Sequence, residues 1–194
     1  MKTKIEIKSI LGNVIFTYEA ENATIKDAVE QAVKDGASLY RVNLYRANLD
    51  GANLYRANLD GANLDEASLY RANLNGANLD GASLDRANLY GANLNGASLY
   101  GASLYRANLN GANLNGASLD RASLNGANLN GANLDGAIKV PIHCKWPHGI
   151  TENNLIHIGC EKRTIQDWDE FFSSDTELET KRGTKEFKQI QAVY

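Results

Sequence analysis

The sequence has few of the residues that usually carry chemistry or covalent cross-links. Its 194 residues include 2 cysteines, 2 prolines, 1 methionine, 2 tryptophans and 3 histidines. Two cysteines cannot form the disulfide framework of a small secreted domain, so a reducing compartment is acceptable. No apolar run approaches the ~18 residues of a membrane-spanning helix, and the N-terminus lacks the pattern of a signal peptide. We therefore expect a cytoplasmic protein with no membrane partner.

The sequence also lacks a charged arm of either sign. The net charge is -3, and it is spread evenly: residues 1–36 carry 5 basic and 6 acidic side chains, residues 37–136 carry 7 and 8, and residues 137–194 carry 8 and 9. Proteins that bind nucleic acid usually concentrate positive charge on one segment or face. We therefore do not expect direct nucleic-acid binding.

What the sequence has in abundance is one pentapeptide, repeated twenty times without a break from Ala37 to Gly136. Each unit has a small residue, then Asn or Ser, then an unvarying Leu, then Tyr, Asp or Asn, and finally Gly, Arg or once Glu66. A helix would spread the leucines around its circumference, and a simple strand would alternate them between two faces. The chain must therefore turn once per unit, with Ala and Leu pointing inward and turn-forming residues at the corner. Stacked coils of this kind form a solenoid with a continuous core.

The signature of Ala, Asn or Asp, Leu and two variable residues resembles the pentapeptide-repeat family. The period alone does not decide between three and four sides, but the resemblance implies an all-β solenoid that is a right-handed quadrilateral β-helix. With four units per coil, the twenty units imply about five coils. A layer spacing of roughly 4.8 Å then gives a rod on the order of 24 Å long.

Composition divides the chain into three predicted domains. We expect an N-terminal hairpin and capping helix in residues 1–36, the β-helix in residues 37–136, and a small α+β module in residues 137–194. Apolar residues alternate with charged ones before Gly12 and resume after it, which predicts the hairpin. The following segment has helical periodicity and begins at Thr24 with a capping-box variant. We expect this helix to cover the open, Leu-lined end of the solenoid.

The C-terminal segment holds both tryptophans, all three histidines, both cysteines and both prolines. Its pattern predicts a hairpin around residues 152–154, a helix that begins at Thr164, and a second helix from about Asp175. Similar short tails occur in pentapeptide-repeat proteins of phages and prophages, so the resemblance suggests a member of that type. C-terminal contacts join two rods in family members that mimic DNA, which implies a homodimer through this module.

Four residues in the C-terminal segment could in principle bind Zn²⁺: Cys144, His148, His157 and Cys160. Their spacings differ from those of common zinc sites, and an extended strand would place His157 and Cys160 on opposite faces. A cysteine nucleophile would also need a base and an oxyanion hole, and the sequence supplies no such set. We favour Cys160 as a small core residue and predict no metal, no cofactor and no catalytic residue.

Tyr-Arg pairs form the candidate interaction surface, and three of them fall in the first four units, which net +2. One hypothesis is that aromatic and basic groups there stack on a nucleic acid strand. We favour the alternative, in which Tyr and Arg cover neighbouring coils and the arginines pair with Asp60, Asp65 or Asp80. The candidate surface residues are Tyr40, Arg41, Tyr45, Arg46, Tyr55 and Arg56.

These patterns predict a non-catalytic structural or protein-interaction solenoid with an unidentified protein partner. The alternative comes from resemblance: the best-known members of the family are quinolone-resistance factors that mimic duplex DNA and bind DNA gyrase, a type II topoisomerase. Such mimicry needs a strongly negative rod, because the DNA groove of gyrase binds phosphates. The near-neutral repeats and the absence of any inserted loop in them count against this alternative.

Overall fold

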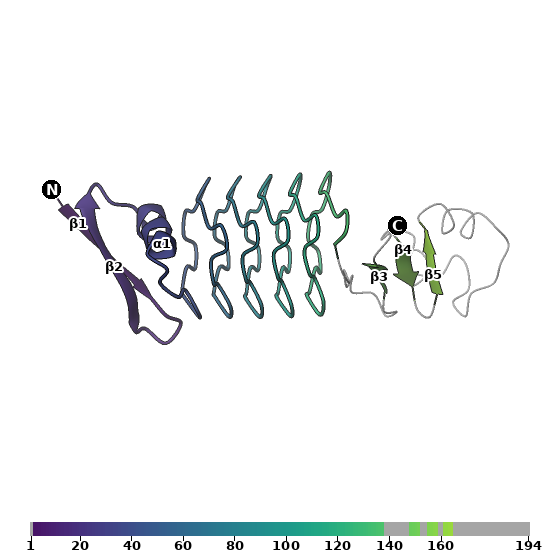
Figure 1. Cartoon of the computed structure of the whole chain (residues 1–194), viewed down its shortest axis with the longest axis horizontal. Coiled ribbons are helices and arrows are strands. Elements are labelled where there is room, and N and C mark those ends of the chain that lie inside the picture. The colour runs from purple at the N-terminus through teal and green to yellow at the C-terminus, as the bar shows by residue number, and fades with distance from the viewer. Residues whose placement is uncertain (1, 138–147, 152–154, 159–160, 165–194) are drawn as a thin grey trace.

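A computed structural model of the chain describes residues 2–137, 148–151, 155–158 and 161–164 (Figure 1). The hairpin β1 (Lys2–Lys8) and β2 (Val14–Glu21) comes first, and α1 (Ile25–Lys34) follows it. The repeats then wind as a regular coil. Within the described part of the chain, no helix is both long and apolar enough to cross a membrane.

The antiparallel hairpin pairs Lys2 with Glu21 at one end and Lys8 with Val14 at the other. Its turn is closed by a hydrogen bond of 2.9 Å from the Gly12 N–H to the Ser9 carbonyl. Gly12 has φ +84°, a conformation that glycine adopts without steric cost. The turn therefore lies at the glycine that punctuates the sequence pattern.

Helix α1 begins with a complete capping box. The Asp27 N–H donates to Thr24 Oγ1 (3.2 Å), and the Thr24 N–H donates to Asp27 Oδ2 (2.9 Å). Hydrogen bonds from the Thr24 side chain and backbone lower the pKa of Asp27 below its ordinary value. On the opposite face Ala28, Val29 and Ala32 are fully buried, in one cluster with the leucines of the repeats.

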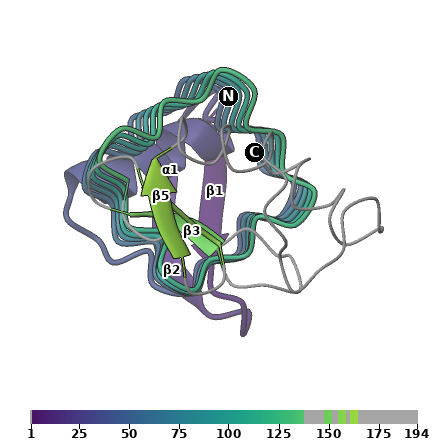
Figure 2. The same cartoon turned by 90° about the vertical axis from the view of Figure 1, so that its right-hand side faces the viewer.

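The repeats form a β-helix with four pentapeptides per turn. Short parallel bridges join second-position residues twenty apart, from Asn43 with Asn63 to Asn113 with Asn133. Because twenty residues are four units, each unit forms one side and each coil lies directly on the next. Figure 2, which looks along the axis, shows the successive coils superposed.

The core of the β-helix is a ladder of leucine and alanine. Every repeat leucine from Leu39 to Leu119 is at most 2% exposed, and the alanines between them are also buried. Backbone bonds between coils run beside this ladder, such as the 2.7 Å bond from the Leu64 N–H to the Ser83 carbonyl. The inward pair of each unit therefore packs as the five-residue period predicts.

Each corner of the coil is a tight turn whose third residue has a positive φ. In the turn from Leu44 to Ala47, the Ala47 N–H donates to the Leu44 carbonyl (3.0 Å) and Arg46 has φ +57°. A positive φ at that position alone is the pattern of a type II turn. The fifth residue of every unit is left-handed, whether it is Gly, Arg or Glu66. Asn and Asp in the fourth position do not share this conformation.

The N-terminal segment continues the layers of the β-helix at its first edge. Ser9, just after β1, forms an antiparallel bridge with Val42. The Asn43 N–H donates to the Lys8 carbonyl (2.8 Å), and the Ile10 N–H donates to the Arg41 carbonyl (2.8 Å). Backbone groups of the first coil, residues 37–56, therefore have partners at this edge.

The C-terminal segment contains a three-stranded antiparallel sheet in the order β3 (His148–Thr151), β4 (Leu155–Ile158) and β5 (Glu161–Thr164). Thr151 pairs with Leu155, so the strands flanking residues 152–154 pair as the sequence predicts. Strand β5 was not anticipated. The helices predicted from Thr164 and from about Asp175 fall in residues 165–194, outside the described part of the chain.

Candidate interaction surface

Fourth-position residues form four columns along the corners of the β-helix. Backbone bonds define them: the Arg41 N–H donates to the Asp60 carbonyl (2.8 Å), and the Arg46 N–H donates to the Asp65 carbonyl (2.9 Å). The first corner carries Tyr40, Asp60, Asp80, Tyr100 and Asp120, and the second carries Tyr45, Asp65, Asp85, Tyr105 and Asn125. Both columns follow nearly the same order of Tyr and Asp.

We call the side between these two corners the charged side. It is bordered by six of the eight acidic residues of the repeats, Asp60, Asp65, Glu66, Asp80, Asp85 and Asp120, and by five of the seven arginines, Arg41, Arg46, Arg86, Arg106 and Arg121. The net charge of the repeats is therefore near zero, but most of their charged side chains border one side of the β-helix. The first corner contributes Asp60, Asp80 and Asp120 to this side, and the second corner contributes Asp65, Glu66 and Asp85.

The structure divides the sequence-predicted surface residues between separate corners. Tyr40 and Arg41 lie at the first corner, Tyr45 and Arg46 at the second, and Tyr55 and Arg56 at the fourth. The first two pairs border the charged side, whereas the third pair does not. The first-coil residues therefore form a ring around the axis, and one flat partner cannot cover all of it.

Each of these arginines lies over the ring of the tyrosine that precedes it. The guanidinium carbon is 5.5 Å from the ring centre for Arg41 on Tyr40, 4.9 Å for Arg46 on Tyr45 and 5.1 Å for Arg56 on Tyr55. Cation–π contacts of this kind are favourable at exposed sites. Because the arginine covers one ring face, these tyrosines are poorly suited to stack on nucleic acid bases.

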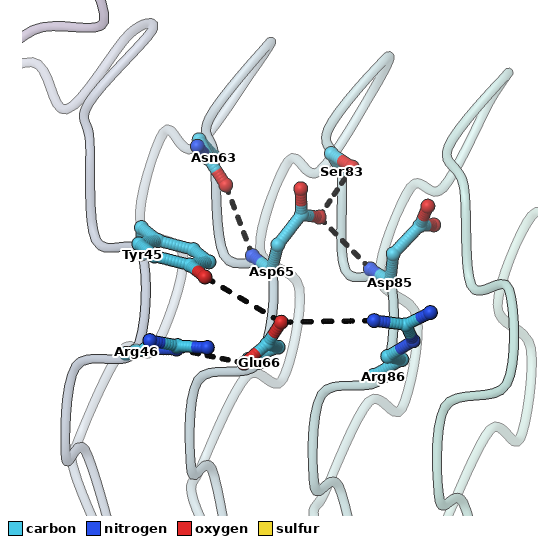
Figure 3. A network of polar contacts seen from close by, with 8 residues as sticks. All are labelled: Tyr45, Arg46, Asn63, Asp65, Glu66, Ser83, Asp85 and Arg86. Carbon is cyan, nitrogen blue, oxygen red and sulfur yellow. Dashed lines mark hydrogen bonds and ion pairs between the residues drawn. The ribbon is translucent and has the colours of Figure 1, made fainter.

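Glu66 links three coils at the second corner (Figure 3). Its carboxylate accepts a 2.7 Å bond from Arg46 Nε, and its other oxygen lies 3.8 Å from Arg86. The Tyr45 hydroxyl also reaches this carboxylate, at 3.5 Å. The bond from Arg46 lowers the pKa of Glu66 below its ordinary value and raises that of Arg46.

The sequence interpretation expected arginines to pair with Asp60, Asp65 or Asp80, and among the described residues none of them does. Asp65 Oδ1 instead accepts bonds from the Ser83 hydroxyl (2.5 Å) and the Asp85 N–H (3.0 Å) on the next coil. Asp80 does the same with Ser98 (2.5 Å). These aspartates occupy the fourth position and bond to the next layer, whereas Glu66 occupies the fifth position, in the same column as Arg46 and Arg86. The expectation that arginines cover the next coil is confirmed, since the Arg41 stem packs on Gly61.

These Asp–Ser bonds follow a rule that sequence reasoning missed. Where the second position is Asn, its own Oδ1 accepts from the backbone two residues on, as Asn63 does from the Asp65 N–H (3.0 Å). At four of the seven second-position serines, an Asp eighteen residues earlier accepts instead. The four such pairs are Asp50–Ser68, Asp65–Ser83, Asp80–Ser98 and Asp85–Ser103. The signal is visible in the sequence as Asp followed by Ser at that spacing.

The side opposite the charged side is lined by asparagine. Its middle column is Asn53, Asn73, Asn93, Asn113 and Asn133. Amide-to-amide bonds run along the neighbouring corner, from Asn75 to Asn95 (3.2 Å) and from Asn95 to Asn115 (3.3 Å). At the third corner Tyr70 stacks on Tyr90, with ring centres 5.6 Å apart. This side therefore presents stacked amide groups, with a pair of stacked tyrosine rings at one of its corners.

Two further surface features lie at the N-terminal end. The hairpin turn exposes Ile10, Leu11 and Val14, and Leu11 is 75% exposed. This turn adjoins the charged side, because Ile10 is hydrogen-bonded to Arg41. Separately, a groove of about 430 Å³ lies between α1 and the first coil and is lined by Glu30, Val33, Lys34, Asn53 and Tyr55.

The described residues contain no group of three or more His, Cys, Asp or Glu side chains placed to hold a metal ion. Cys144 and Cys160 of the candidate zinc set lie outside the described part of the chain, so that hypothesis stays a prediction.

The sequence of the repeats decides the family. The family model for pentapeptide repeats matches with 8 copies over residues 37–76, 67–104 and 102–138, which together span more than half of the chain. The chain belongs to the pentapeptide-repeat family. Its four-unit coil is accordingly the right-handed quadrilateral β-helix of that family.

Solved pentapeptide-repeat proteins are similar to parts of this chain. One from the Arabidopsis thaliana thylakoid lumen is 30% identical, with 43% of this chain and 61% of that chain covered and a TM-score of 0.39. HetL from the cyanobacterium Nostoc, involved in heterocyst differentiation regulation, is 37% identical, with 59% and 55% covered and a TM-score of 0.25. QnrB1, a plasmid-mediated fluoroquinolone resistance protein, is 16% identical, with 49% and 63% covered and a TM-score of 0.39.

This chain spans less than two thirds of the length of each of these three proteins. No curated protein matches the chain in sequence. Pentapeptide-repeat proteins are generally structural or interaction proteins.

Proposed function

We propose that this pentapeptide-repeat protein is a non-catalytic solenoid that binds a protein partner through its charged side. The observation that carries the proposal is the segregation of charge onto that side, which four of the seven tyrosines of the repeats also border, opposite a side with no net charge that is lined by asparagine. Tyrosine and arginine are the residues that most often dominate binding energy at protein interfaces. The β-helix holds them on a rigid lattice, which lowers the ordering cost of binding.

The N-terminal end of the charged side offers the best anchor for such a partner. Tyr40 and Tyr45 are 48% and 46% exposed, and the exposed aliphatic side chains of the hairpin turn lie beside them. Arg41 has no ion pair among the described residues, so its charge is available to a partner carboxylate. Apolar anchors beside an unpaired arginine fit a partner with an apolar pocket and an acidic rim.

The test uses substitutions that the repeats already tolerate. Tyr40→Asn with Arg41→Gly turns the first unit into Ala-Ser-Leu-Asn-Gly, the sequence of residues 122–126, and keeps glycine at the left-handed position. Tyr55→Asn with Arg56→Gly is the matched control at the fourth corner. Affinity capture from the native host should retain a partner with the wild type and the control, and lose it with the first variant.

Binding of that partner, once purified, is then measured by calorimetry. The first variant should weaken affinity at least tenfold, about 1.4 kcal/mol. Equal affinity for both variants would contradict the proposed surface. A turnover activity abolished by Cys160→Ala would contradict the non-catalytic assignment itself.

A second candidate is a DNA-mimicking modulator of DNA gyrase, favoured by the five carboxylates of residues 60–85 that border the charged side. Against it, Arg46 and Arg86 lie among those carboxylates, and Arg46 neutralises Glu66 directly. Gyrase supercoiling assayed with added protein decides between the two. No effect at micromolar concentration removes this candidate.

The same proposal includes a rod of about five coils and a homodimer through the C-terminal module. We further propose a cytoplasmic location and a phage or prophage origin. Light scattering of the full chain and of a chain ending at Gly136 tests the dimer. The full chain should scatter as a dimer and the shorter chain as a monomer.

A further inference from the structure

The corners of the β-helix carry six Asn-Gly pairs, which differ in how the structure holds them. They are Asn75–Gly76, Asn95–Gly96, Asn110–Gly111, Asn115–Gly116, Asn125–Gly126 and Asn130–Gly131. In such a pair the glycine nitrogen can attack the asparagine side-chain carbonyl carbon, because glycine has no Cβ to obstruct ring closure. A hydrogen bond that holds the glycine N–H opposes this attack, since the nitrogen must give up its proton.

Four of these glycines are held by the next coil. The N–H groups of Gly76, Gly96, Gly111 and Gly116 donate to backbone carbonyls at 2.9, 2.8, 2.8 and 2.9 Å. Three of the preceding asparagines are held as well, because Asn75, Asn95 and Asn115 form the amide ladder of the fourth corner. At these sites both reacting groups are fixed in other bonds.

The remaining two glycines lie on the last coil of the repeats. Within the described residues, the N–H groups of Gly126 and Gly131 have no acceptor, because the last repeat unit ends at Gly136. The side chains of Asn125 and Asn130 likewise have no partner among those residues, and Asn130 is exposed. The two pairs have the same local sequence as the protected ones but lack, in the part of the chain that the structure describes, the bonds that hold those pairs.

We propose that Asn125 and Asn130 are sites of spontaneous deamidation, a modification confined to the last coil. The glycine nitrogen forms a bond to the asparagine side-chain carbon, its proton passes to solvent, and the amide nitrogen leaves with added protons as ammonia. Water then opens the five-membered imide and yields aspartate or isoaspartate. Nothing is oxidised or reduced in either step, and water is the only co-reactant.

The modification changes both charge and backbone at this end. Each event adds one negative charge, which at Asn125 lies in the corner column of Arg106. Isoaspartate also lengthens the backbone by one atom and breaks the five-residue period. The Asn125 carbonyl accepts from the Arg106 N–H (2.8 Å) and the Asn130 carbonyl from the Gly111 N–H (2.8 Å), so these bonds between coils are the first to be disturbed.

The test is timed incubation of the purified full chain at mildly alkaline pH, followed by peptide mass spectrometry that separates aspartate from isoaspartate. Asn125 and Asn130 should react at least about fivefold faster than Asn75, Asn95 and Asn115, a factor matching one net hydrogen bond. Asn110, whose glycine is held but whose side chain has no described partner, should fall between the two groups.

Two controls keep the outcome decisive. In concentrated urea all six sites should react at similar rates, because unfolding removes the bonds that distinguish them. The Asn125→Gln and Asn130→Gln double variant should lack the fast phase in the folded state. Equal rates at all six sites in the folded protein, or protection of Asn125 and Asn130 to the level of Asn75, would overturn the proposal.

Discussion

Single residues at the corners carry a backbone conformation that most side chains avoid. Eight arginine or glutamate residues share the left-handed fifth position with glycine, with φ between 51° and 60°. Such a conformation costs a residue with a Cβ roughly 1–2 kcal/mol. Most of the arginines offset part of this cost through contacts that glycine cannot make. Six of the seven lie over a tyrosine ring, and the stems of Arg41, Arg56, Arg71 and Arg106 pack on the next coil.

Gly96 isolates the backbone cost from those contacts. A Cβ there would meet no atom within 4 Å, so steric crowding is absent, but φ is +62°. Gly96→Ala should lower the free energy of unfolding by about 1 kcal/mol. Gly96→Asn is the matched control and should cost less, because asparagine tolerates this conformation. Urea unfolding followed by circular dichroism measures both, and equal costs would contradict the explanation.

Glu66 gives the corner network a dependence on pH. Arg46 lowers the pKa of Glu66 in the folded state, so the stabilisation is present at neutral pH. It should be lost as the pH falls through that lowered pKa, below the ordinary glutamate value of about 4.3. The unfolding midpoints of the wild type and Glu66→Gln should therefore differ at neutral pH and converge in acid. A difference that persists unchanged in acid would rule out this role.

At the scale of elements, two devices satisfy the backbone N–H at most corners. An asparagine in the second position accepts from its own unit, whereas at four of the serine units an aspartate of the preceding coil takes that role. Asp65 therefore supports Ser83 and the Asp85 N–H at once. The choice between Asn and Ser in the sequence is thus coupled to a residue eighteen positions away.

A double-mutant cycle tests this coupling. Asp65→Ala removes the acceptor for two donors and should destabilise the protein by about 1–3 kcal/mol. Adding Ser83→Asn should restore much of the loss, because the new amide oxygen can accept from the Asp85 N–H as Asn63 does from Asp65. Asp60→Ala is the control and should cost less, since Asn78 already accepts from the Asp80 N–H (3.0 Å). Additive effects of the two substitutions would contradict the rule.

Many of the elements described above could be predicted from the sequence, whereas the side-chain contacts between coils depended on geometry. The five-residue period predicts the inward leucines and the corners, and the capping box at Thr24 predicts the start of α1. The number of sides came from the family resemblance and not from the period, and once it was known the columns could be read directly. The partners of Asp65 and Glu66 could not be read in this way, because whether a carboxylate bonds to a serine or to an arginine depends on where the fourth and fifth positions of a corner point relative to the next coil.

The same limit applies to the candidate surface. Tyr40, Tyr45 and Tyr55 are near one another in the sequence, but a chain that turns every five residues sends them to different corners. Strand β5 was missed because Glu161–Thr164 is short and polar and pairs as the outer strand of its sheet, which leaves little apolar pattern to detect.

At the scale of the whole molecule, the β-helix is one continuous core without a separate centre for each repeat. The buried cluster runs from Ile7 through α1 and along the leucine ladder to Ala137. Each inner coil is packed between two others, and the first coil is packed between the N-terminal segment and the second. At the last coil, Leu129 and Leu134 are only partly buried by the described residues. Stability in such a structure is approximately a sum of nearest-neighbour terms.

The position of a leucine should therefore decide the cost of removing it. Leu84→Ala, in the middle of the ladder, should lower the free energy of unfolding by roughly 2–5 kcal/mol through lost burial and a cavity. Leu134→Ala should cost clearly less, because that side chain is already partly exposed. Thermal unfolding of both variants measures the difference. Equal losses would show that the last coil is packed as tightly as the middle.

The Asp–Ser bonds also bear on how a repeat array of this kind can change its length. Four pentapeptides form a closed layer, so gain or loss of twenty residues leaves the path of the chain intact. Where the asparagine of the same unit accepts from the corner N–H, this bond does not depend on which layer lies beside the corner. Where an aspartate accepts from the next layer, the bond does depend on that layer, because an added layer between Asp65 and Ser83 would separate the two side chains. Asparagine units are therefore interchangeable along the array, whereas each aspartate and its serine fix two layers in a set order.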